Sequence, residues 1–151
     1  MVATAAPVET VLVPVDGSEE SFRAVEYGVE IAARYDAGLH LLYVIPEPVM
    51  RGMEDGTVDA AAVANETDTF VDDVEAAAAD RSVALSTSTA AGFSRMRKTR
   101  HPGSVILDTS EGIDADFIVI PREPVTGKPD RMFEKAAEYV LLYASQPVLS
   151  V

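Results

Sequence analysis

The sequence predicts an open, mostly parallel α/β sheet with helices on both of its faces. Short apolar runs alternate along the 151 residues with longer stretches whose apolar residues recur at helical spacing. The runs at residues 10–15 and 39–45 are apolar almost throughout, which is typical of parallel strands buried on both faces. Connections between such strands form right-handed crossovers.

The expected strands are residues 10–15, 39–45, 83–89, 116–120 and 147–151, and the expected helices are residues 19–35, 58–80, 103–111 and 131–144. Apolar and hydroxyl residues alternate in 83–89, which suits a half-exposed edge strand. Prolines and glycines predict loops at 46–57 and 121–130. Residues 90–101 fit no regular element and hold a local basic run whose role the sequence does not indicate.

The first helix carries signals at both of its ends. Ser18 precedes Glu19 and Glu20, so we expect its side chain to cap the helix and the two acids to favour its first turn. Asp36-Ala37-Gly38 follows the helix, and we expect Gly38 to take a left-handed cap conformation.

The segment 11–18, VLVPVDGS, is the first place to look for a site. It is a buried strand that ends in Asp16-Gly17-Ser18 and leads directly into a helix. In open α/β sheets, ligands bind outside the carboxyl ends of the strands, where the strand order reverses.

The charge composition indicates the salt environment of the protein and limits the partners that it can bind. With 25 acidic and 12 basic residues, the formal net charge is −13, and three of the bases are lysines. An acidic, lysine-poor protein indicates a halophilic, salt-rich cytoplasm in which salt screens the self-repulsion; an ordinary acidic protein is the open alternative. The charge argues against non-specific nucleic-acid binding, which needs a basic face.

Several classes of site and location are disfavoured. There is no cysteine, so neither a disulfide nor a cysteine-ligated metal is possible, and His40 and His101 lie far apart without metal spacing. No apolar run approaches the roughly 20 residues that span a bilayer. We therefore expect a cytoplasmic protein with no membrane contact and no metal. No Ser–His–acid set with an elbow motif is visible, so we do not expect an enzyme.

Four segments together resemble the universal stress protein family. They are VLVPVDGSEES, GLHLLYVIPEP, SVILDTSEGIDADFIVI and the closing QPVLSV, and they cover nearly the whole chain in the family's order. The resemblance implies a Rossmann-like sheet of five parallel strands in the order 3-2-1-4-5. It also implies one domain over residues 1–151, and we expect residues 1–9 to be a loose lead-in.

Many members of that family bind ATP at the switch point between the first and fourth strands. The positions that match their adenosine side are Pro14, Asp16 and Val44. An acidic side chain can accept hydrogen bonds from ribose hydroxyls, so Asp16 suits that role. Asp16 could equally end the strand and order the turn to Gly17, and one residue can do both.

The phosphate side of the family's site is degenerate in this sequence. The family pattern Gly-x2-Gly-x9-Gly-(Ser/Thr) falls on Pro121, Pro124, Glu134 and Lys135, and Gly127 remains as a flexible point. Proline has no N–H to donate, and a carboxylate repels a polyphosphate. We therefore expect absent or weak ATP binding and no cofactor, with a dimeric, non-catalytic stress-response module as the function.

An alternative stays open. Basic side chains around the loop could replace its lost backbone donors and hold ATP or AMP, with or without slow hydrolysis; the candidates are Arg122, Lys128, Arg131 and Lys135. They could also offset neighbouring acids on a solvated face. Members of the family commonly pair through their last strands, and an apolar edge strand pairs readily with its own copy. We therefore expect a homodimer through residues 147–151.

Overall fold

The computed structural model describes residues 7–91, 101–122 and 132–151. The described elements form one five-stranded sheet in the order β3-β2-β1-β4-β5, and every strand pair is parallel. The sheet order that the resemblance implies is therefore confirmed. In chain order the elements are β1 (Thr10–Val15), α1 (Glu19–Tyr35), β2 (Gly38–Ile45), α2 (Glu47–Asp55), α3 (Ala60–Asp80), β3 (Leu85–Ala91), α4 (Pro102–Gly112), β4 (Phe117–Ile120), α5 (Met132–Tyr143) and β5 (Val148–Ser150).

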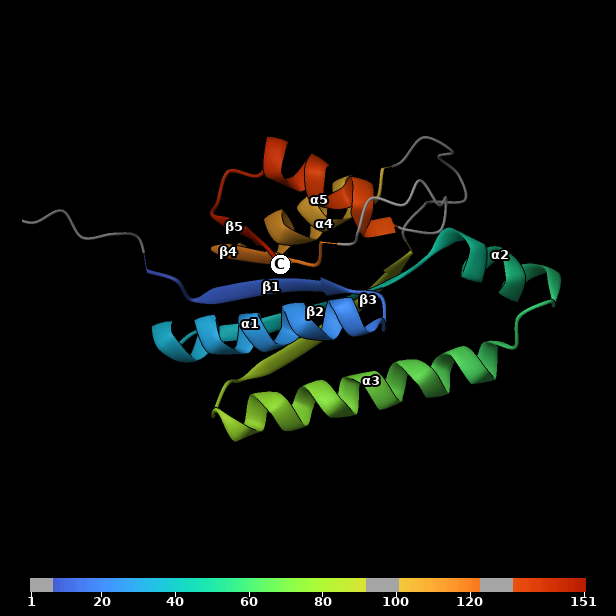
Figure 1. Cartoon of the computed structure of the whole chain (residues 1–151), viewed down its shortest axis with the longest axis horizontal. Helices are drawn as coiled ribbons and strands as arrows, with labels where there is room; N and C mark the ends of the chain where they lie inside the picture. Colours follow the sequence, from blue (N-terminus) through green and yellow to red (C-terminus); the bar gives the residue numbers. More distant parts are fainter. Residues whose placement is uncertain (1–6, 92–100, 123–131) are drawn as a thin grey trace, which may run out of the picture.

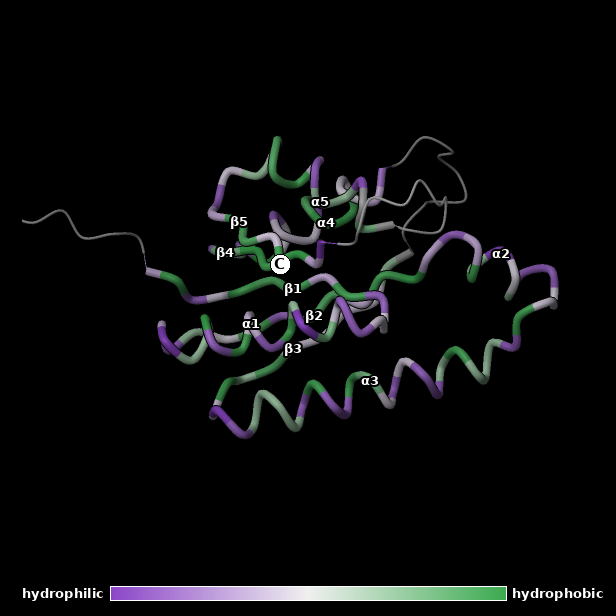
Figure 2. Tube along the Cα trace, in the orientation of Figure 1, coloured by the Kyte–Doolittle hydropathy of each residue, from purple (hydrophilic) through white to green (hydrophobic). Residues whose placement is uncertain are grey.

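The sheet separates two layers of helices (Figure 1). Helices α1 and α3 lie on one face, and α4 and α5 lie on the other. Strand β1 supplies both cores, since Val11, Val13 and Val15 pack into the α1–α3 side while Leu12 packs into the α4–α5 side. Strands β1 and β4 are mostly hydrophobic in Figure 2, as their apolar runs predict.

Helix α1 has the predicted bounds, but a different residue from the predicted one takes the left-handed position after it. The Ser18 side chain accepts a hydrogen bond from the Ser21 backbone N–H and caps the helix. The left-handed position at the other end belongs to Asp36, with φ 55°, so the prediction of a Gly38 cap is wrong. Asp tolerates this region better than most residues. Gly38 is free to begin β2, where its backbone N–H bonds the Glu9 carbonyl.

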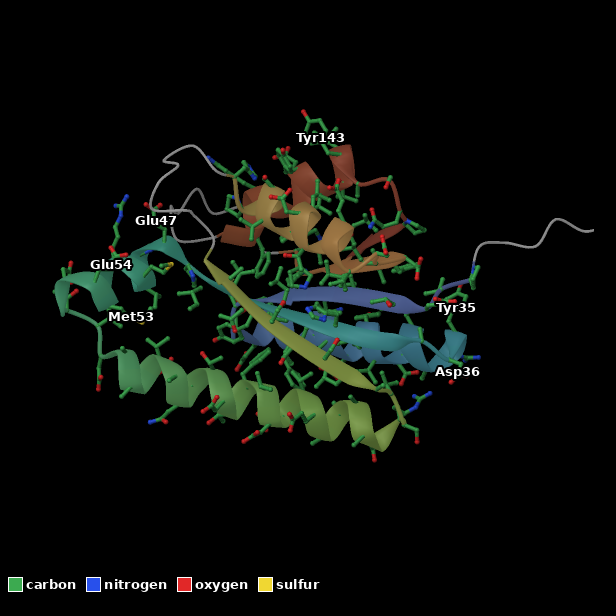
Figure 3. All side chains as sticks on the ribbon, turned by 180° about the vertical axis from the view of Figure 1, so that it is seen from behind. Tyr35, Asp36, Glu47, Met53, Glu54 and Tyr143 are labelled. Carbon is green, nitrogen blue, oxygen red and sulfur yellow. The ribbon has the colours of Figure 1, made fainter. Side chains whose placement is uncertain are left out.

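The loop predicted at 46–57 is also wrong, because it contains helix α2. Pro46 is the N-cap and Pro48 lies in the first turn, where a missing N–H costs no hydrogen bond. Gly56 ends the helix with φ 82°. The prolines and glycine that predict a loop instead mark the beginning and the end of a short helix. Figure 1 shows α2 beyond the end of the sheet, and Figure 3 labels its residues Glu47, Met53 and Glu54.

Helix α3 begins two residues later than predicted and ends at Asp80 as predicted, whereas strand β3 is shifted by two residues at both ends. Asp59 caps α3, whose buried residues are Phe70, Val74 and Ala78. The Val83 N–H bonds the Ala78 carbonyl in the last turn of the helix, so this residue does not enter the sheet ladder. Strand β3 starts at Leu85 and forms one edge of the sheet, as its alternation predicts. The described helices include none that is both long and apolar enough to cross a membrane.

Candidate functional site

The carboxyl ends of β1 and β4 meet at the point where the strand order reverses. From β1 the chain first builds β2 and β3 on one side, and it then crosses to β4 and β5 on the other. Asp16 follows β1 directly and Pro121 follows β4 directly, so both lie at this edge. This is the position in an open α/β sheet where a ligand finds a crevice between diverging connections.

The turn after β1 is ordered by side chains. Asp16 Oδ1 accepts a hydrogen bond of 3.0 Å from the Ser18 N–H, and the Ser21 hydroxyl lies 3.4 Å from the Asp16 nitrogen and accepts its N–H. The Ser21 hydroxyl also donates to the Ser18 carbonyl over 2.9 Å. Asp16 therefore has the turn-ordering role that the sequence allowed, and its carboxylate is held at the mouth of the crevice.

The turn after β1 requires a glycine at position 17. Its φ is +88°, and a Cβ placed on it would lie 2.4 Å from the Tyr43 hydroxyl oxygen. That hydroxyl donates a hydrogen bond of 3.3 Å to the Asp16 carbonyl. The tyrosine of β2 thus closes over the turn that follows β1.

A cavity of about 470 Å³ opens beside this turn, on the α3 side of the sheet. Asp16, Gly17 and Tyr43 form its sheet wall, and α3 forms the opposite wall. The α3 residues that line it are Asn65, Glu66, Thr69, Phe70 and Asp73. Three carboxylates face this space, so it suits hydroxyl or amine groups and repels phosphates.

Aromatic contacts hold the α3 wall of the cavity against the sheet wall and helix α1. Phe70 meets Phe22 and Tyr43 edge-to-face, with ring centroids 5.7 and 5.9 Å apart. Burial raises the pKa of Tyr43, the carboxylates of Asp16 and Glu66 raise it further, and a hydrogen bond with Thr67 opposes them. Tyr43 therefore keeps its proton at neutral pH and remains a hydrogen-bond donor.

The sequence candidates for the adenosine side lie together at this edge. Pro14 is a buried residue of β1 opposite Leu42, and Val44 is fully buried in β2 opposite Ala90. Their side chains are part of the core, so a ligand would meet the main chain here. Asp16 is the candidate of this group whose side chain reaches the cavity.

The phosphate-side candidates are described in part. Pro121 is buried directly after β4, and the exposed Arg122 donates its backbone N–H to the Val151 carbonyl. Lys135 lies exposed in the first turn of α5, next to Glu134. The remaining candidates, Pro124, Gly127, Lys128 and Arg131, lie outside the described residues.

His101 lies close to Lys135. Its Nδ1 accepts a hydrogen bond of 3.0 Å from the Gly103 N–H and so caps α4, and its ring stacks on Tyr139 with centroids 4.5 Å apart. Burial lowers the pKa of His101, and the charge of Lys135 lowers it further. A neutral imidazole at this position keeps Nδ1 free to accept.

Two features of the structure were not predicted from the sequence. The first is the polar wall of α3, although Asn65, Thr69 and Asp73 recur every four residues and so share one helix face. The second is a cluster on β2 and β3 in which His40 contacts Ser86 and Ser88. The sequence feature that could have indicated this cluster is the pair Ser86 and Ser88, which lie two residues apart in the predicted edge strand and therefore on the same face. No group of three or more potential metal ligands occurs within the described part of the chain.

The fold and its crevice define an α/β protein of the doubly wound class. A model of the universal stress protein family matches residues 7–151, and the chain belongs to this family. A comparison with curated proteins finds no significant match.

Solved structures agree with this assignment. Universal stress protein UspA from Lactobacillus plantarum is 26% identical, with 97% of this chain and 99% of that chain covered and a TM-score of 0.70. A universal stress protein in complex with cAMP is 20% identical, with coverage of 97% and 98% and a TM-score of 0.66. The Archaeoglobus fulgidus universal stress protein in complex with dAMP is 17% identical, with coverage of 96% and 98% and a TM-score of 0.63.

Proposed function

We propose that this protein is a dimeric, non-catalytic binding module of a stress response, which holds an adenosine moiety weakly and has lost the grip on a triphosphate. The observation that carries the proposal is Pro121, buried at the end of β4 where the family pattern has its first phosphate-loop glycine. A proline offers no N–H to a phosphate and fills the space that a bare Cα leaves.

The adenosine half of the site supports the same reading. Asp16 lies directly after β1 at the switch point, where it orders the turn to Ser18, and its carboxylate can accept hydrogen bonds from ribose hydroxyls. The cAMP and dAMP complexes of similar proteins contain one phosphate per nucleotide. An adenine nucleoside monophosphate therefore fits this chain better than ATP.

Calorimetric titration at high salt with adenosine, AMP and Mg-ATP tests the proposal. We expect AMP to bind at least as tightly as Mg-ATP, because the extra phosphates gain no backbone donors. Asp16→Asn keeps the acceptor for the Ser18 N–H but removes the charge, whereas Asp16→Ala removes both. We expect both variants to weaken AMP binding and only Asp16→Ala to lower the melting temperature by a measurable amount. Micromolar Mg-ATP affinity would refute the proposal.

A second function keeps ATP binding and uses side-chain cations for the phosphates. What favours it is the exposed Lys135 in the first turn of α5, close enough to His101 to lower its pKa. In that case Lys135→Ala and Arg122→Ala weaken Mg-ATP binding more than AMP binding. If Mg-ATP does not bind, or if both nucleotides respond equally, this second function is excluded.

The free edge of β5 supports the proposed homodimer. Strand β5 pairs with β4 on one side and ends the sheet on the other. The Pro147 carbonyl and the Val151 N–H both bond to β4, so the alternation of a parallel ladder turns the N–H groups of residues 148 and 150 outward. Leu141, Leu142 and Tyr143 at the end of α5 add exposed apolar surface, and Tyr143 points away from the sheet in Figure 3.

Ser150→Pro tests this interface. The substitution removes an outward N–H and leaves the bonds to β4 in place, while Ser150→Ala is the matched control. Light scattering after size exclusion at high salt should find a dimer for the wild type and for Ser150→Ala, and a monomer for Ser150→Pro. A wild-type monomer at micromolar concentration, or a dimer that survives Ser150→Pro, would exclude pairing through β5.

A further inference from the structure

The residues that carry the inference lie on the β2–β3 half of the sheet, away from the crevice. His40 lies opposite Ser86 in the β2–β3 register, and Ser88 is the next residue of β3 on the same face. The two serines therefore flank the imidazole ring from both ends. The Ser86 hydroxyl lies 2.7 Å from Nδ1, and the Ser88 hydroxyl lies 2.8 Å from Nε2.

The hydrogen bonds of this array assign different roles to the two hydroxyls. A neutral imidazole has one N–H donor and one acceptor nitrogen. One serine must therefore accept from the ring, and the other must donate its hydroxyl proton to the ring. The donating serine is a hydroxyl in contact with a base, and the accepting serine orients that base, which is the arrangement that activates a serine nucleophile.

Exposure distinguishes the two serines. Ser86 is exposed on the edge strand, whereas Ser88 is half-buried and His40 is buried, with 9% of its surface accessible. An electrophile from solvent can thus reach Ser86. Burial also lowers the pKa of His40, so the ring is neutral at pH 7 and able to take a proton.

We propose that Ser86 is a reactive nucleophile toward small activated acyl or phosphoryl donors, with His40 as its base and Ser88 as the residue that positions the ring. In the acyl case, Ser86 Oγ forms a bond to the carbonyl carbon while its proton passes to Nδ1 of His40. The bond from that carbon to the leaving group breaks, and the leaving group departs with the proton from His40. The products are an ester of Ser86 and the protonated leaving group, so atoms and charge balance.

The proposed reaction ends with the acylated Ser86. The proposal is for single acylation of the folded protein and does not include turnover. It is therefore compatible with a non-catalytic binding module, and it is independent of what occupies the crevice beside Asp16.

Labelling with diisopropyl fluorophosphate and with p-nitrophenyl acetate tests the inference on the whole protein. Peptide mass spectrometry should place the principal adduct of both reagents on Ser86. We expect His40→Gln to slow the labelling by about 100-fold, the scale of general-base assistance. Thr87→Ala is the matched control, since it removes a hydroxyl from the same strand on the opposite face and should leave the rate unchanged.

Two further measurements separate a positioning role from a structural one. The wild-type labelling rate should be level above pH 6.5 and fall below it as His40 takes up a proton. Ser88→Ala should slow labelling, and Ser88→Thr, which keeps the hydroxyl, should restore most of it. Absence of a Ser86 adduct on the wild type, an adduct spread over many serines, or a rate that does not follow His40 protonation would overturn the proposal.

Discussion

The Tyr43 hydroxyl donates a 3.3 Å hydrogen bond to the Asp16 carbonyl, and through it β2 closes over the turn that ends β1. The residue between them in space is Gly17, whose missing side chain leaves room for that hydroxyl. The turn, the cavity and the start of α1 thus depend on one close approach between two strands.

Gly17→Ala is expected to destabilise the protein in two ways. A left-handed φ costs an alanine roughly 1–2 kcal/mol, and the new Cβ would also meet the Tyr43 hydroxyl oxygen at 2.4 Å. Gly56→Ala is the matched control, because Gly56 has φ +82° but no atom within 4 Å of an added Cβ. Urea denaturation should show a larger loss of unfolding free energy for Gly17→Ala than for Gly56→Ala.

The excess loss at Gly17 should depend on the tyrosine hydroxyl. In a Tyr43→Phe background the nearest obstacle is removed, so Gly17→Ala should cost about as much as Gly56→Ala. Equal costs for the two glycine substitutions in the wild-type background would contradict the close approach.

The cap of α4 is expected to depend on pH. His101 accepts from the Gly103 N–H through an unprotonated Nδ1, and burial followed by the charge of Lys135 lowers its pKa from 6.5. His101 therefore binds a proton more readily in the unfolded chain than in the folded one. The free energy of unfolding is expected to be highest above about pH 6.5 and to decrease as the pH falls below 6.5.

His101→Asn separates the titration from the cap. Asparagine is a good N-cap and does not titrate, but it loses the stacking on Tyr139, so the variant should be somewhat less stable than the wild type near pH 8 and should lose less further stability between pH 6.5 and pH 5. His40, whose pKa burial also lowers, remains in both proteins and contributes equally to each. Parallel stability curves for wild type and variant across this range would show that the cap is not sensitive to pH.

The net charge of −13 is expected to make stability depend on salt. Self-repulsion destabilises the compact state, and salt screens it, with a Debye length of about 3 Å at 1 M. Melting temperatures measured from 0.1 to 2 M KCl should therefore rise, as in a protein adapted to a salt-rich cytoplasm.

A less acidic variant provides the control for screening. The substitutions Asp68→Asn, Asp72→Asn and Glu75→Gln neutralise exposed positions of α3 without touching its buried face. The variant should be more stable than the wild type at 0.1 M KCl and respond less to added salt. If the melting temperature of the variant rises with KCl as much as that of the wild type, charge repulsion is not the cause of the salt effect.

Much of the fold could be predicted because buried parallel strands have a continuous apolar signature. All five strands and the four longer helices follow from that periodicity, and Ser18 follows from its capping chemistry. Helix α2 did not follow, because Pro46, Pro48 and Gly56 have the same identity in a loop as at the ends of a short helix. The Gly38 prediction was wrong because Asp36 also tolerates the left-handed region.

The site could be predicted where it depends on strand ends. Asp16 could be placed at the crevice because the switch point is set by topology. The α3 wall of the cavity and the pairing of His40 with Ser86 and Ser88 depend on register and on how α3 packs against the sheet. Neither the lateral register of β2 against β3 nor that packing is set by local sequence, so these contacts appear only in the folded chain.

We propose that substitutions at the family's loop positions have removed the backbone donors that hold a triphosphate. The most direct test restores them together as Pro121→Gly, Pro124→Gly, Glu134→Gly and Lys135→Ser, with circular dichroism to verify the fold. Titration at high salt should give a wild type that binds Mg-ATP no more tightly than AMP, and a restored variant that gains at least about tenfold for Mg-ATP and little for AMP. A wild type that binds Mg-ATP with micromolar affinity, or a folded restored variant that gains no affinity for Mg-ATP, would contradict the account.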